Sequence, residues 1–353
     1  MFGYVLSGEY EELPYGELMA LLNIYKYKGN VERLKRYVLT ENSPVKEIIK
    51  RSGYVDEGHR VIFRYNLENR DINLIDEITK DFINTFKSFI DNIEYYPDID
   101  ENKSFAVRVL KLHKDDFTKK IDSLKIEREI GGIIKLKTNA KVNLTKPDVL
   151  VRVVILKDSF IIGNVLGMRD REYFQKNRPH LRKYFHPGCI LPKLARAMVN
   201  LARVKEGDIV LDPFCGTGGF LIEAGLIGAK LIGCDIDWRM SSGTLINLEE
   251  YNLIDKVIKV KRLDAKYVKD FLNELGIKEV DAIVTDPPYG ISTAKKGEIE
   301  NILKILPDVI KKNGYFVFAY PKKIDLNDME LESLYKIYIH KGLIRHIHVY
   351  RKI

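Results

Sequence analysis

From about residue 190 to the end, the sequence alternates between short runs rich in β-branched residues and longer stretches with helical periodicity. Strands that alternate with helices in this way predict a parallel, doubly wound α/β sheet. The predicted strands are residues 208–213, 230–235, 257–262, 280–285 and 314–320. No internal repeat or low-complexity segment interrupts the pattern.

The first half of the chain lacks this alternation and mixes helical with strand patterns. Apolar residues recur at helical spacing in residues 16–28 and 72–90, which predicts two amphipathic helices. Alternating or continuous apolar runs predict strands, of which the last two form a hairpin. These strands are residues 60–65, 105–110, 149–156 and 160–166. The first half is therefore predicted to be an α+β region.

Residues 167–188 differ from both halves, because they carry basic and aromatic side chains with no clear period. We interpret this stretch as a linker or surface segment. The sequence thus predicts an N-terminal region over residues 1–165, a basic linker over 166–182 and a C-terminal α/β domain over 183–353. A chain of 353 residues is long for a single hydrophobic core, which favours such a division.

A glycine-containing turn follows the first predicted strand of the C-terminal domain and opens a helix. Its sequence is Asp212-Pro213-Phe214-Cys215-Gly216-Thr217-Gly218-Gly219. Glycine permits a tight turn and a close approach of the backbone to a ligand at the helix N-terminus. The glycine spacing is not that of the dinucleotide fingerprint, and the Gly-Lys-Ser/Thr of a phosphate loop is missing. The turn is therefore predicted to belong to another kind of cofactor site.

Acidic residues lie at the ends of two further predicted strands. Asp235 lies 23 residues after Asp212, where a carboxylate can accept both ribose hydroxyls of an adenosine ligand. Asp264 lies 29 residues beyond Asp235, where its carboxylate can accept a hydrogen bond from the exocyclic amine of the adenine in the same ligand. Either carboxylate taken alone is equally typical of a helix cap or a solvated turn. Because both carboxylates lie at the ends of successive predicted strands, the sequence favours binding of an adenosine ligand over a structural role.

The segment Asp286-Pro287-Pro288-Tyr289 follows the fourth predicted strand and indicates methyl transfer to a base amine. An exocyclic amine is a poor nucleophile because its lone pair is delocalised into the ring. An enzyme must therefore accept hydrogen bonds from the amine as positive charge develops. Asp286 and the Pro287 carbonyl can do this on a backbone that two prolines fix, and Tyr289 offers a ring on which a base can stack. The alternative is a simple proline turn at a strand end.

Net charge and cysteine spacing narrow the choice of partners. The chain has a formal net charge of +8 and a sequence pI of about 9.0. This charge is consistent with a polyanion partner, because each phosphate neutralised by Lys or Arg releases condensed counterions. Cys189, Cys215 and Cys234 match neither zinc-ligand spacing nor a disulfide framework, so no metal site is predicted.

The sequence shows no membrane or export signal. No stretch approaches the roughly 20 apolar residues that a membrane span requires. The N-terminus lacks the basic-then-apolar order of a signal peptide. We therefore expect a cytoplasmic protein without a membrane partner, and nothing in the sequence implies an oligomeric partner.

These motifs also carry a resemblance to known enzymes. Residues 180–353 resemble the amino-group methyltransferases of the Rossmann-like class, through Asp-x-Phe-x-Gly-x-Gly at 212–218 and Asp-Pro-Pro-Tyr at 286–289. The whole chain resembles the archaeal tRNA guanine-10 N2-methyltransferase family, which carries a THUMP domain before its catalytic domain. The further matching motifs are Tyr-Phe-His-Pro-Gly at 184–188, Leu-Pro-Lys-Leu-Ala-Arg at 191–196, His-Val-Tyr-Arg-Lys at 348–352 and Asn-Leu-Thr-Lys-Pro-Asp-Val at 143–149.

The resemblance implies a fold, a cofactor and a substrate. It implies a ferredoxin-like and THUMP region that binds tRNA, and a Rossmann-like domain that uses S-adenosylmethionine to make N2-methyl- and N2,N2-dimethylguanosine at position 10. It places Asp286, Pro287, Pro288 and Tyr289 at the target amine. The expected cofactor residues are His186, Asp212, Phe214, Gly216, Thr217, Gly218, Gly219, Asp235, Ile236, Asp264, Ala265 and Asp286.

Eight basic residues are candidates for RNA contact, although a solvated charged surface explains each of them equally well. They are Lys146, Arg152, Arg169, Arg171, Lys176, Arg178, Arg182 and Lys183. Two alternative functions stay open. One is methylation of adenine N6 in RNA or DNA, an amine that the Asp-Pro-Pro-Tyr motif also serves. The other is an RNA-binding protein whose methyltransferase-like domain is inactive.

Overall fold

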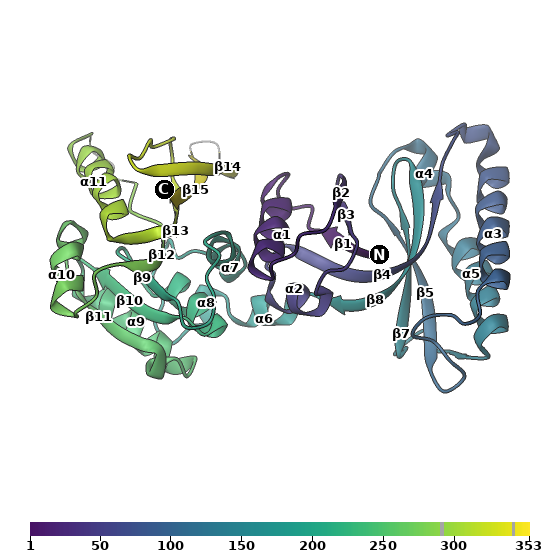
Figure 1. The fold of residues 1–353 in the computed structure, drawn as a ribbon, viewed down its shortest axis with the longest axis horizontal. Coiled ribbons are helices and arrows are strands. Elements are labelled where there is room, and N and C mark those ends of the chain that lie inside the picture. Colours follow the sequence, from purple (N-terminus) through teal and green to yellow (C-terminus); the bar gives the residue numbers. More distant parts are fainter. Residues whose placement is uncertain (290–292, 341–342) are drawn as a thin grey trace. The chain divides into compact units, whose positions relative to one another are not determined.

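The computed structural model describes residues 1–289, 293–340 and 343–353, which form two compact units (Figure 1). The first unit comprises Met1–Ser7, Lys28–Lys50 and Val55–Met168. The second unit comprises Gly8–Tyr27, Arg51–Tyr54 and Arg169–Ile353. Both units are discontinuous in sequence, because two N-terminal segments belong to the second one. The predicted boundaries near 165 and 182 assume continuous domains and stay a prediction.

A mixed sheet with the strand order β2-β3-β1-β4-β8-β7-β5-β6 forms the first unit. Its strands are β1 (Phe2–Leu6), β2 (Val31–Leu34), β3 (Tyr37–Thr40), β4 (Val55–Asn66), β5 (Ser104–Lys111), β6 (Lys141–Val142), β7 (Val149–Ile155) and β8 (Ser159–Met168). β7 and β8 pair antiparallel as the predicted hairpin, and β5 pairs parallel with β7. The sequence did not predict β1, β2 and β3, because they are short and β3 is buried on both faces without alternation.

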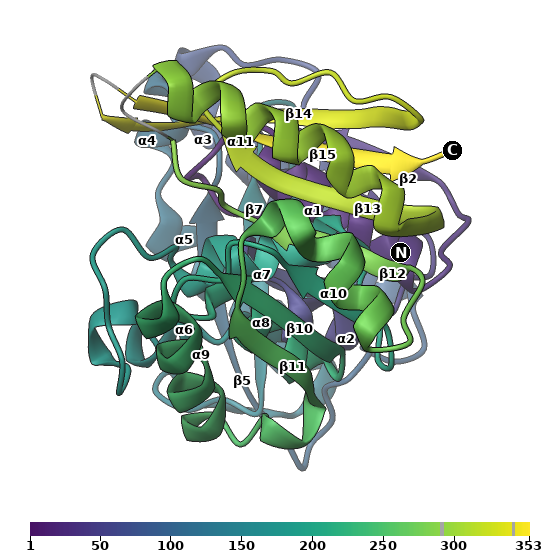
Figure 2. The ribbon, with the colours of Figure 1, turned by 90° about the vertical axis from the view of Figure 1, so that its left-hand side faces the viewer.

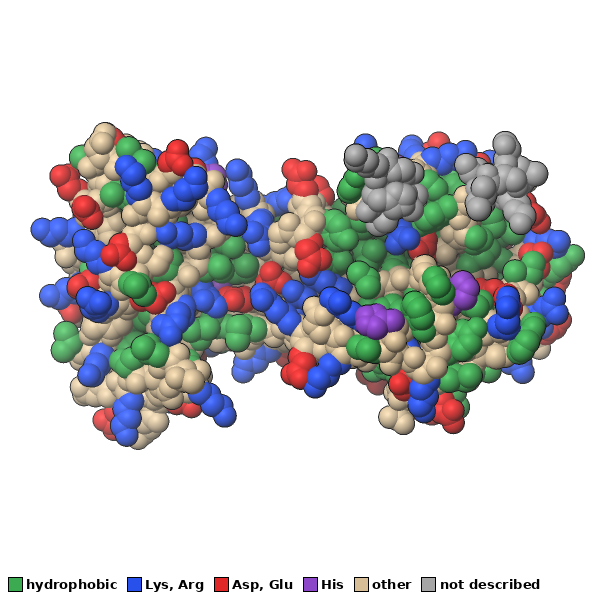
Figure 3. Space-filling view, turned by 180° about the vertical axis from the view of Figure 1, so that it is seen from behind, with side chains coloured by type: hydrophobic (Ala, Val, Ile, Leu, Met, Phe, Trp, Pro, Cys, Tyr) green, Lys and Arg blue, Asp and Glu red, His purple; other side chains and the backbone are tan. Residues whose placement is uncertain are grey.

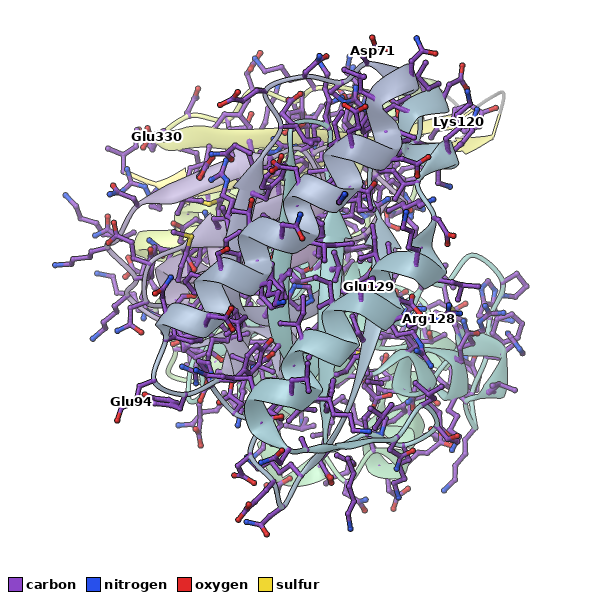
Figure 4. All side chains as sticks on the ribbon, turned by 90° about the vertical axis from the view of Figure 1, so that its right-hand side faces the viewer. Asp71, Glu94, Lys120, Arg128, Glu129 and Glu330 are labelled. Carbon is purple, nitrogen blue, oxygen red and sulfur yellow. The ribbon has the colours of Figure 1, made fainter. Side chains whose placement is uncertain are left out.

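Two long helices cover one face of this sheet, as Figure 4 shows from the helical side. The helices here are α2 (Val45–Arg51), η1 (Ile72–Leu74), α3 (Ile75–Asn92), α4 (Asp116–Lys120) and α5 (Ser123–Thr138). Phe82 and Phe86 of α3 are buried in the core, as the periodicity of residues 72–90 predicts. Arg128 and Glu129 lie on the exposed side of α5, where Figure 4 labels them. The first unit is thus an α+β layer structure.

The second unit contains a doubly wound sheet with the order β11-β10-β9-β12-β13-β15-β14. The pairings from β11 to β13 are parallel, and β15 is antiparallel to both β13 and β14. Its strands are β9 (Ile209–Asp212), β10 (Lys230–Asp235), β11 (Val257–Arg262), β12 (Val280–Thr285), β13 (Ile310–Tyr320), β14 (Met329–His340) and β15 (Leu343–Lys352). The predicted C-terminal fold class is therefore confirmed, and each predicted strand overlaps an observed one.

Helices cover both faces of this sheet (Figure 2). α7, α8 and α9 share one hydrophobic core with the sheet, and α10 and α11 share a second core on the opposite face. The helices are α1 (Leu13–Ile24), α6 (Arg171–Lys176), η2 (Pro179–Leu181), α7 (Pro192–Leu201), α8 (Gly219–Ile227), α9 (Trp238–Glu250), η3 (Ile254–Lys256), η4 (Ala265–Tyr267), α10 (Val268–Glu274), α11 (Thr293–Ile305) and η5 (Leu306–Val309). Among the described residues, no helix is both long enough and apolar enough to span a membrane. The supposedly irregular linker contains α6, a helix too short to show periodicity.

Helix α1 belongs to the core of the second unit although it lies near the N-terminus. Its Glu17 is fully buried and accepts hydrogen bonds from the backbone N–H groups of Gly53 (2.7 Å) and Tyr54 (2.6 Å). Glu17 also accepts from Nδ2 of Asn200 on α7 (2.7 Å). The apolar spacing of residues 16–28 predicted a helix, but it did not indicate which core the helix joins.

Candidate active site

The carboxyl ends of the central parallel strands surround a cavity of about 540 Å³. Ligands bind at this edge of a doubly wound sheet, at the point where the strand order reverses, which here lies between β9 and β12. The expected cofactor residues that line the cavity are His186, Asp212, Phe214, Gly216, Thr217, Gly219, Asp235, Ile236, Asp264, Ala265 and Asp286. Gly218 is the expected residue outside the lining, and it instead forms the N-cap of α8.

The glycine turn has the conformation that its composition predicts. Gly216 and Gly218 have φ angles of 50° and 84°, in the left-handed region where a side chain is strained. A Cβ on Gly218 would also lie 3.0 Å from Cγ2 of Thr244, whereas a Cβ on Gly216 would meet nothing within 4 Å. The backbone N–H of Gly216 donates to Oδ2 of Asp235 (3.0 Å), which ties the turn to the end of β10.

Asp212 has an unsatisfied oxygen at the wall of the cavity. Its side chain is buried, and Oδ1 accepts hydrogen bonds from the Thr285 hydroxyl (2.7 Å) and the backbone N–H of Phe214 (3.2 Å). Oδ2 is buried and has no hydrogen-bond partner among the described residues. Burial raises the pKa of Asp212 to about 7, and the charges of Asp235 and Asp286 also raise it. Oδ2 is therefore available to a cationic or hydrogen-bond-donating group of a ligand.

Asp235 and Asp264 accept hydrogen bonds from the backbone of the loops that follow them, and both also line the cavity. Asp235 accepts from the backbone N–H of Asp237 (3.0 Å), and burial raises its pKa. Asp264 caps η4 by accepting from the backbone N–H of Lys266 (3.1 Å), and its carboxylate lies 3.2 Å from Nζ of the same lysine. The helix-cap role, which the sequence left open as an alternative for Asp264, is therefore observed. Each carboxylate also lines the cavity, and each can accept more hydrogen bonds than these.

Asp286 forms the centre of the second motif. Its side chain is 15% exposed, and Oδ1 accepts a hydrogen bond from the Tyr289 hydroxyl (2.6 Å). Nη2 of Arg345 lies 3.2 Å from Oδ2, and Nε of Arg345 donates to the Tyr289 hydroxyl (2.6 Å). Burial raises the pKa of Asp286, whereas the charge of Arg345 and the hydrogen bond from Tyr289 lower it. The carboxylate is held at the cavity wall with its remaining lone pairs free to accept.

Of the other predicted catalytic residues, one lines the cavity and two lie outside its lining. Pro288 is exposed and lines the cavity, whereas Pro287 is buried outside the lining. Tyr289 is half-buried, and its ring meets Tyr320 edge-on with 6.2 Å between ring centroids. In this structure the Tyr289 hydroxyl is hydrogen-bonded to Asp286 and Arg345. Its predicted role as a stacking surface for the base stays a prediction.

Some residues of the site carried no signal in the sequence. Arg345 lies just before the matching motif at 348–352 and outside the two site motifs, and it meets Asp286 because β15 lies beside β13 in the sheet. The α11 residues that line the cavity lie beyond the Asp-Pro-Pro-Tyr motif and are Glu298, Ile299 and Ile302. Among the residues that the structure describes, no group of three or more His, Cys, Asp or Glu side chains could hold a metal ion.

The eight candidate RNA-contact residues differ in exposure. Lys146, Arg171, Lys176, Arg178 and Lys183 are exposed, and Arg169 is half-buried. Two of the candidates offer little surface to RNA: Arg182 is 6% exposed, and the side chain of Arg152 is 13% exposed. Arg152 makes a bidentate pair with Glu57 (2.7 and 2.9 Å), because that largely buried carboxylate needs a counter-ion.

Sheet order, cavity and family matches together define the class of this protein as a Rossmann-like methyltransferase with an additional N-terminal region. The RMKL-like methyltransferase domain family matches residues 179–344, and the THUMP domain family matches residues 92–165. The fold is similar to the crystal structure of TrmN from Thermus thermophilus, with a TM-score of 0.57 and 20% identity over 100% of this chain and 99% of that one.

Sequence relatives narrow the class to one family. The chain is 83% identical over 353 residues, covering 100% of both chains, to the tRNA (guanine(10)-N2)-dimethyltransferase of Methanocaldococcus jannaschii. It is 44% identical over 261 residues to the protein of that name from Methanothermobacter thermautotrophicus, covering 71% of this chain and 74% of the relative. This chain belongs to the tRNA (guanine(10)-N2)-dimethyltransferase family, and the resemblance found in its sequence is confirmed.

Proposed function

We propose that this protein methylates the N2 amine of guanosine at position 10 of tRNA, once or twice, with S-adenosylmethionine as methyl donor. The observation that carries the proposal is the position of Asp286, a fixed carboxylate on the wall of the cavity that the glycine turn also lines. The identity of 83% to a relative named for this activity supports the same substrate. The adenine-N6 alternative and the inactive RNA-binding alternative find no such support.

The residues of the cavity fit this cofactor. S-adenosylmethionine, when bound, supplies an electrophilic methyl group on a positively charged sulfur. The unpartnered Oδ2 of Asp212 offers an acceptor to a cationic group, and Asp235 and Asp264 offer carboxylate oxygens to hydroxyl or amine groups. The open space beside the Cα of Gly216 leaves room for a ligand to approach the turn.

The chain's own residues act on the amine in three ways. Asp286 accepts a hydrogen bond from the target amine and stabilises the positive charge that develops on the nitrogen. The Pro287 carbonyl stays a predicted second acceptor, and Pro287 is buried outside the cavity lining. The cavity walls hold the two reactants together, which lowers the entropic part of the barrier, and exclude bulk water.

The first experiment identifies the product. The protein is incubated with unmodified tRNA and labelled S-adenosylmethionine, and the RNA is then digested to nucleosides. N2-methylguanosine or its dimethyl form is the expected product. N6-methyladenosine would instead support the alternative enzyme, and the absence of any methylated nucleoside together with retained RNA binding would support the inactive scaffold.

Exposed basic residues in both units support the proposal of tRNA binding. Figure 3 shows Lys and Arg side chains over much of the surface of the first unit. A hollow of about 240 Å³ in that unit has a predominantly basic lining. Its basic side chains are Arg33, Lys35, Arg36, Arg64, His113 and Lys157. Such a surface attracts the phosphate backbone of RNA, because neutralised phosphates release their counterions.

The segment around α6 gives a prediction for RNA affinity. Replacing Arg171, Arg178 and Lys183 together with alanine should weaken tRNA binding and reduce the slope of log K against log salt. The expected reduction in slope is about 0.7–0.9 for each phosphate that these side chains no longer neutralise. The measurement is filter binding or fluorescence anisotropy over a series of salt concentrations.

A matched control separates contact from net charge. Lys259, Lys269 and Lys278 are also exposed in the second unit, and their replacement with alanine removes the same charge. This control should keep the wild-type salt slope. Equal losses in both triple variants would contradict the assignment, since they would indicate only a general electrostatic attraction.

The raised pKa of Asp212 predicts a pH dependence of cofactor binding. Its pKa of about 7 means that the carboxyl is mainly protonated in more acidic solution, where it has no negative charge to pair with a cationic group. Affinity for S-adenosylmethionine should therefore rise with pH and approach a tenfold change per pH unit below about 7. Calorimetry between about pH 5.5 and 7.5 measures this slope. Asp212→Asn should flatten it, whereas Asp264→Asn should lower affinity and keep the slope.

A further inference from the structure

Arg345 of β15 reaches the Asp-Pro-Pro-Tyr loop from another part of the sheet. β12 ends just before Asp286, β13 pairs with β12, and β15 pairs with β13. In this register His346 lies opposite Tyr320, the last residue of β13, so Arg345 lies at the edge of the sheet where the loop begins. Its side chain is only 14% exposed. A guanidinium so far removed from water requires partners within the protein.

Those partners are the two polar side chains of the loop. Arg345 contacts Oδ2 of Asp286 through Nη2 (3.2 Å) and the Tyr289 hydroxyl through Nε (2.6 Å), and that hydroxyl donates to Oδ1 of Asp286 (2.6 Å). The three side chains thus close a ring of two hydrogen bonds and one ion pair. Hydrogen bonds in which one partner is charged are stronger and more directional than neutral ones. Each oxygen of Asp286 has one partner in this ring and keeps a further lone pair.

We propose that Arg345 is a positioning residue for methyl transfer, which fixes the Asp286 carboxylate directly and through the Tyr289 hydroxyl so that its free lone pairs face the target amine. This inference rests on the function proposed above and deepens the role of Asp286. Arg345 itself touches no substrate. Its contribution is to remove the rotational freedom of the carboxylate before the base arrives, so that the acceptor is already aligned when the amine is presented.

The charge of Arg345 has a second consequence at the same carboxylate. The charge of Asp286 raises the pKa of the neighbouring Asp212, and burial raises the pKa of Asp286 itself. Arg345 lowers that pKa, and it also interacts with Tyr10. A protonated Asp286 would donate where it must accept. Removing the guanidinium should therefore move the acid limb of the pH–kcat profile to higher pH.

Three variants test the proposal in the full-length protein. Arg345→Met should lower kcat by about 10–100-fold, with KM for tRNA and the affinity for S-adenosylmethionine within about threefold of wild type. The acid limb of the pH–kcat profile of this variant should move to higher pH. Arg345→Lys keeps the charge, so it should restore the position of the limb and part of kcat. Tyr289→Phe removes the bridging hydroxyl and should lower kcat with a smaller movement of the limb.

Arg351→Met is the matched control, because Arg351 lies on the same strand and pairs with Glu330 rather than with the site. It should leave kcat and the pH profile unchanged. The proposal is overturned if Arg345→Met keeps wild-type kcat and an unshifted limb. It is also overturned if kcat and cofactor affinity fall in parallel without any recovery in Arg345→Lys, since that pattern indicates a purely structural role.

A second readout needs no activity. In protein labelled with ¹³C at aspartate carboxyls, the resonance of Asp286 is assigned by its loss in Asp286→Asn, and its titration is compared between wild type, Arg345→Met and Arg345→Lys. A higher pKa of Asp286 in the methionine variant alone supports the proposal, and equal titration in all three proteins refutes it. If wild type makes no methylated guanosine, the proposed function fails, whereas this titration still decides the role of Arg345.

Discussion

Replacing Asp286 with alanine should lower kcat for methyl transfer by about 100- to 1000-fold while cofactor and tRNA affinities stay within a few fold. The reason is that Asp286 is proposed to interact most strongly with the amine when positive charge develops on it. An interaction realised mainly in the transition state affects turnover more than binding. Alanine also leaves Tyr289 and Arg345 without their shared acceptor, which adds to the loss.

The measurement is single-turnover methylation with enzyme in excess, together with calorimetry for S-adenosylmethionine and a thermal melt. Asp325→Ala is the matched control, because its side chain is 84% exposed and pairs only with Lys323 among the described residues. The control should behave as wild type. Near-wild-type activity of Asp286→Ala would refute the assigned role, and a low melting temperature with lost cofactor binding would assign Asp286 to structure instead.

The largest expected effect on stability comes from a buried ion pair of the second unit. Glu223 of α8 is fully buried and accepts from Nε of Arg196 on α7 (2.7 Å) and from the Tyr173 hydroxyl on α6 (2.9 Å). Glu223→Ala leaves Arg196, whose side chain is only 10% exposed, without this counter-ion. Such a change should lower the free energy of unfolding by about 3–5 kcal/mol. Urea denaturation followed by circular dichroism measures this loss.

Glu172→Ala provides the comparison for that experiment. Glu172 and Lys176 form an ion pair in which both side chains are 73% exposed. Water solvates such charges almost as well as the pair does, so its loss should cost about 0.5 kcal/mol or less. Similar destabilisation in the two variants would indicate that the alanine substitution itself, rather than the unpaired guanidinium, causes the effect.

Long regular elements of this fold were predictable because their residues repeat a local physical pattern. The five parallel strands and helix α3 have apolar residues at fixed spacing, and burial on the sheet or helix face imposes that spacing. Strands β1 to β3 and helix α6 were missed because four to six residues cannot display a period. The placement of α1 was missed because it depends on its partner in the fold, and a local pattern says nothing about partners.

The same distinction separates the predicted from the unpredicted parts of the site. The glycine turn, Asp235, Asp264 and Asp286 could be assigned because each follows a predicted strand, and parallel strands bring their carboxyl ends to one edge. Arg345 could not be assigned, since its approach to Asp286 depends on β15 being inserted antiparallel beside β13. Arg152 and Arg182 were predicted to contact RNA although their side chains are largely buried, because a charge in a sequence does not reveal whether the fold buries it.

The presence of α1 and residues 51–54 in the second unit limits how this protein can be divided. A fragment that starts at residue 179, where the methyltransferase family match begins, would lack Glu17, Tyr54 and the other N-terminal contributors to that unit's core. Asn200 would then lose a buried acceptor, and apolar area on α7 would face water. The catalytic half therefore cannot be exchanged between proteins by recombination at a single junction, and the N-terminal segments must be inherited with it.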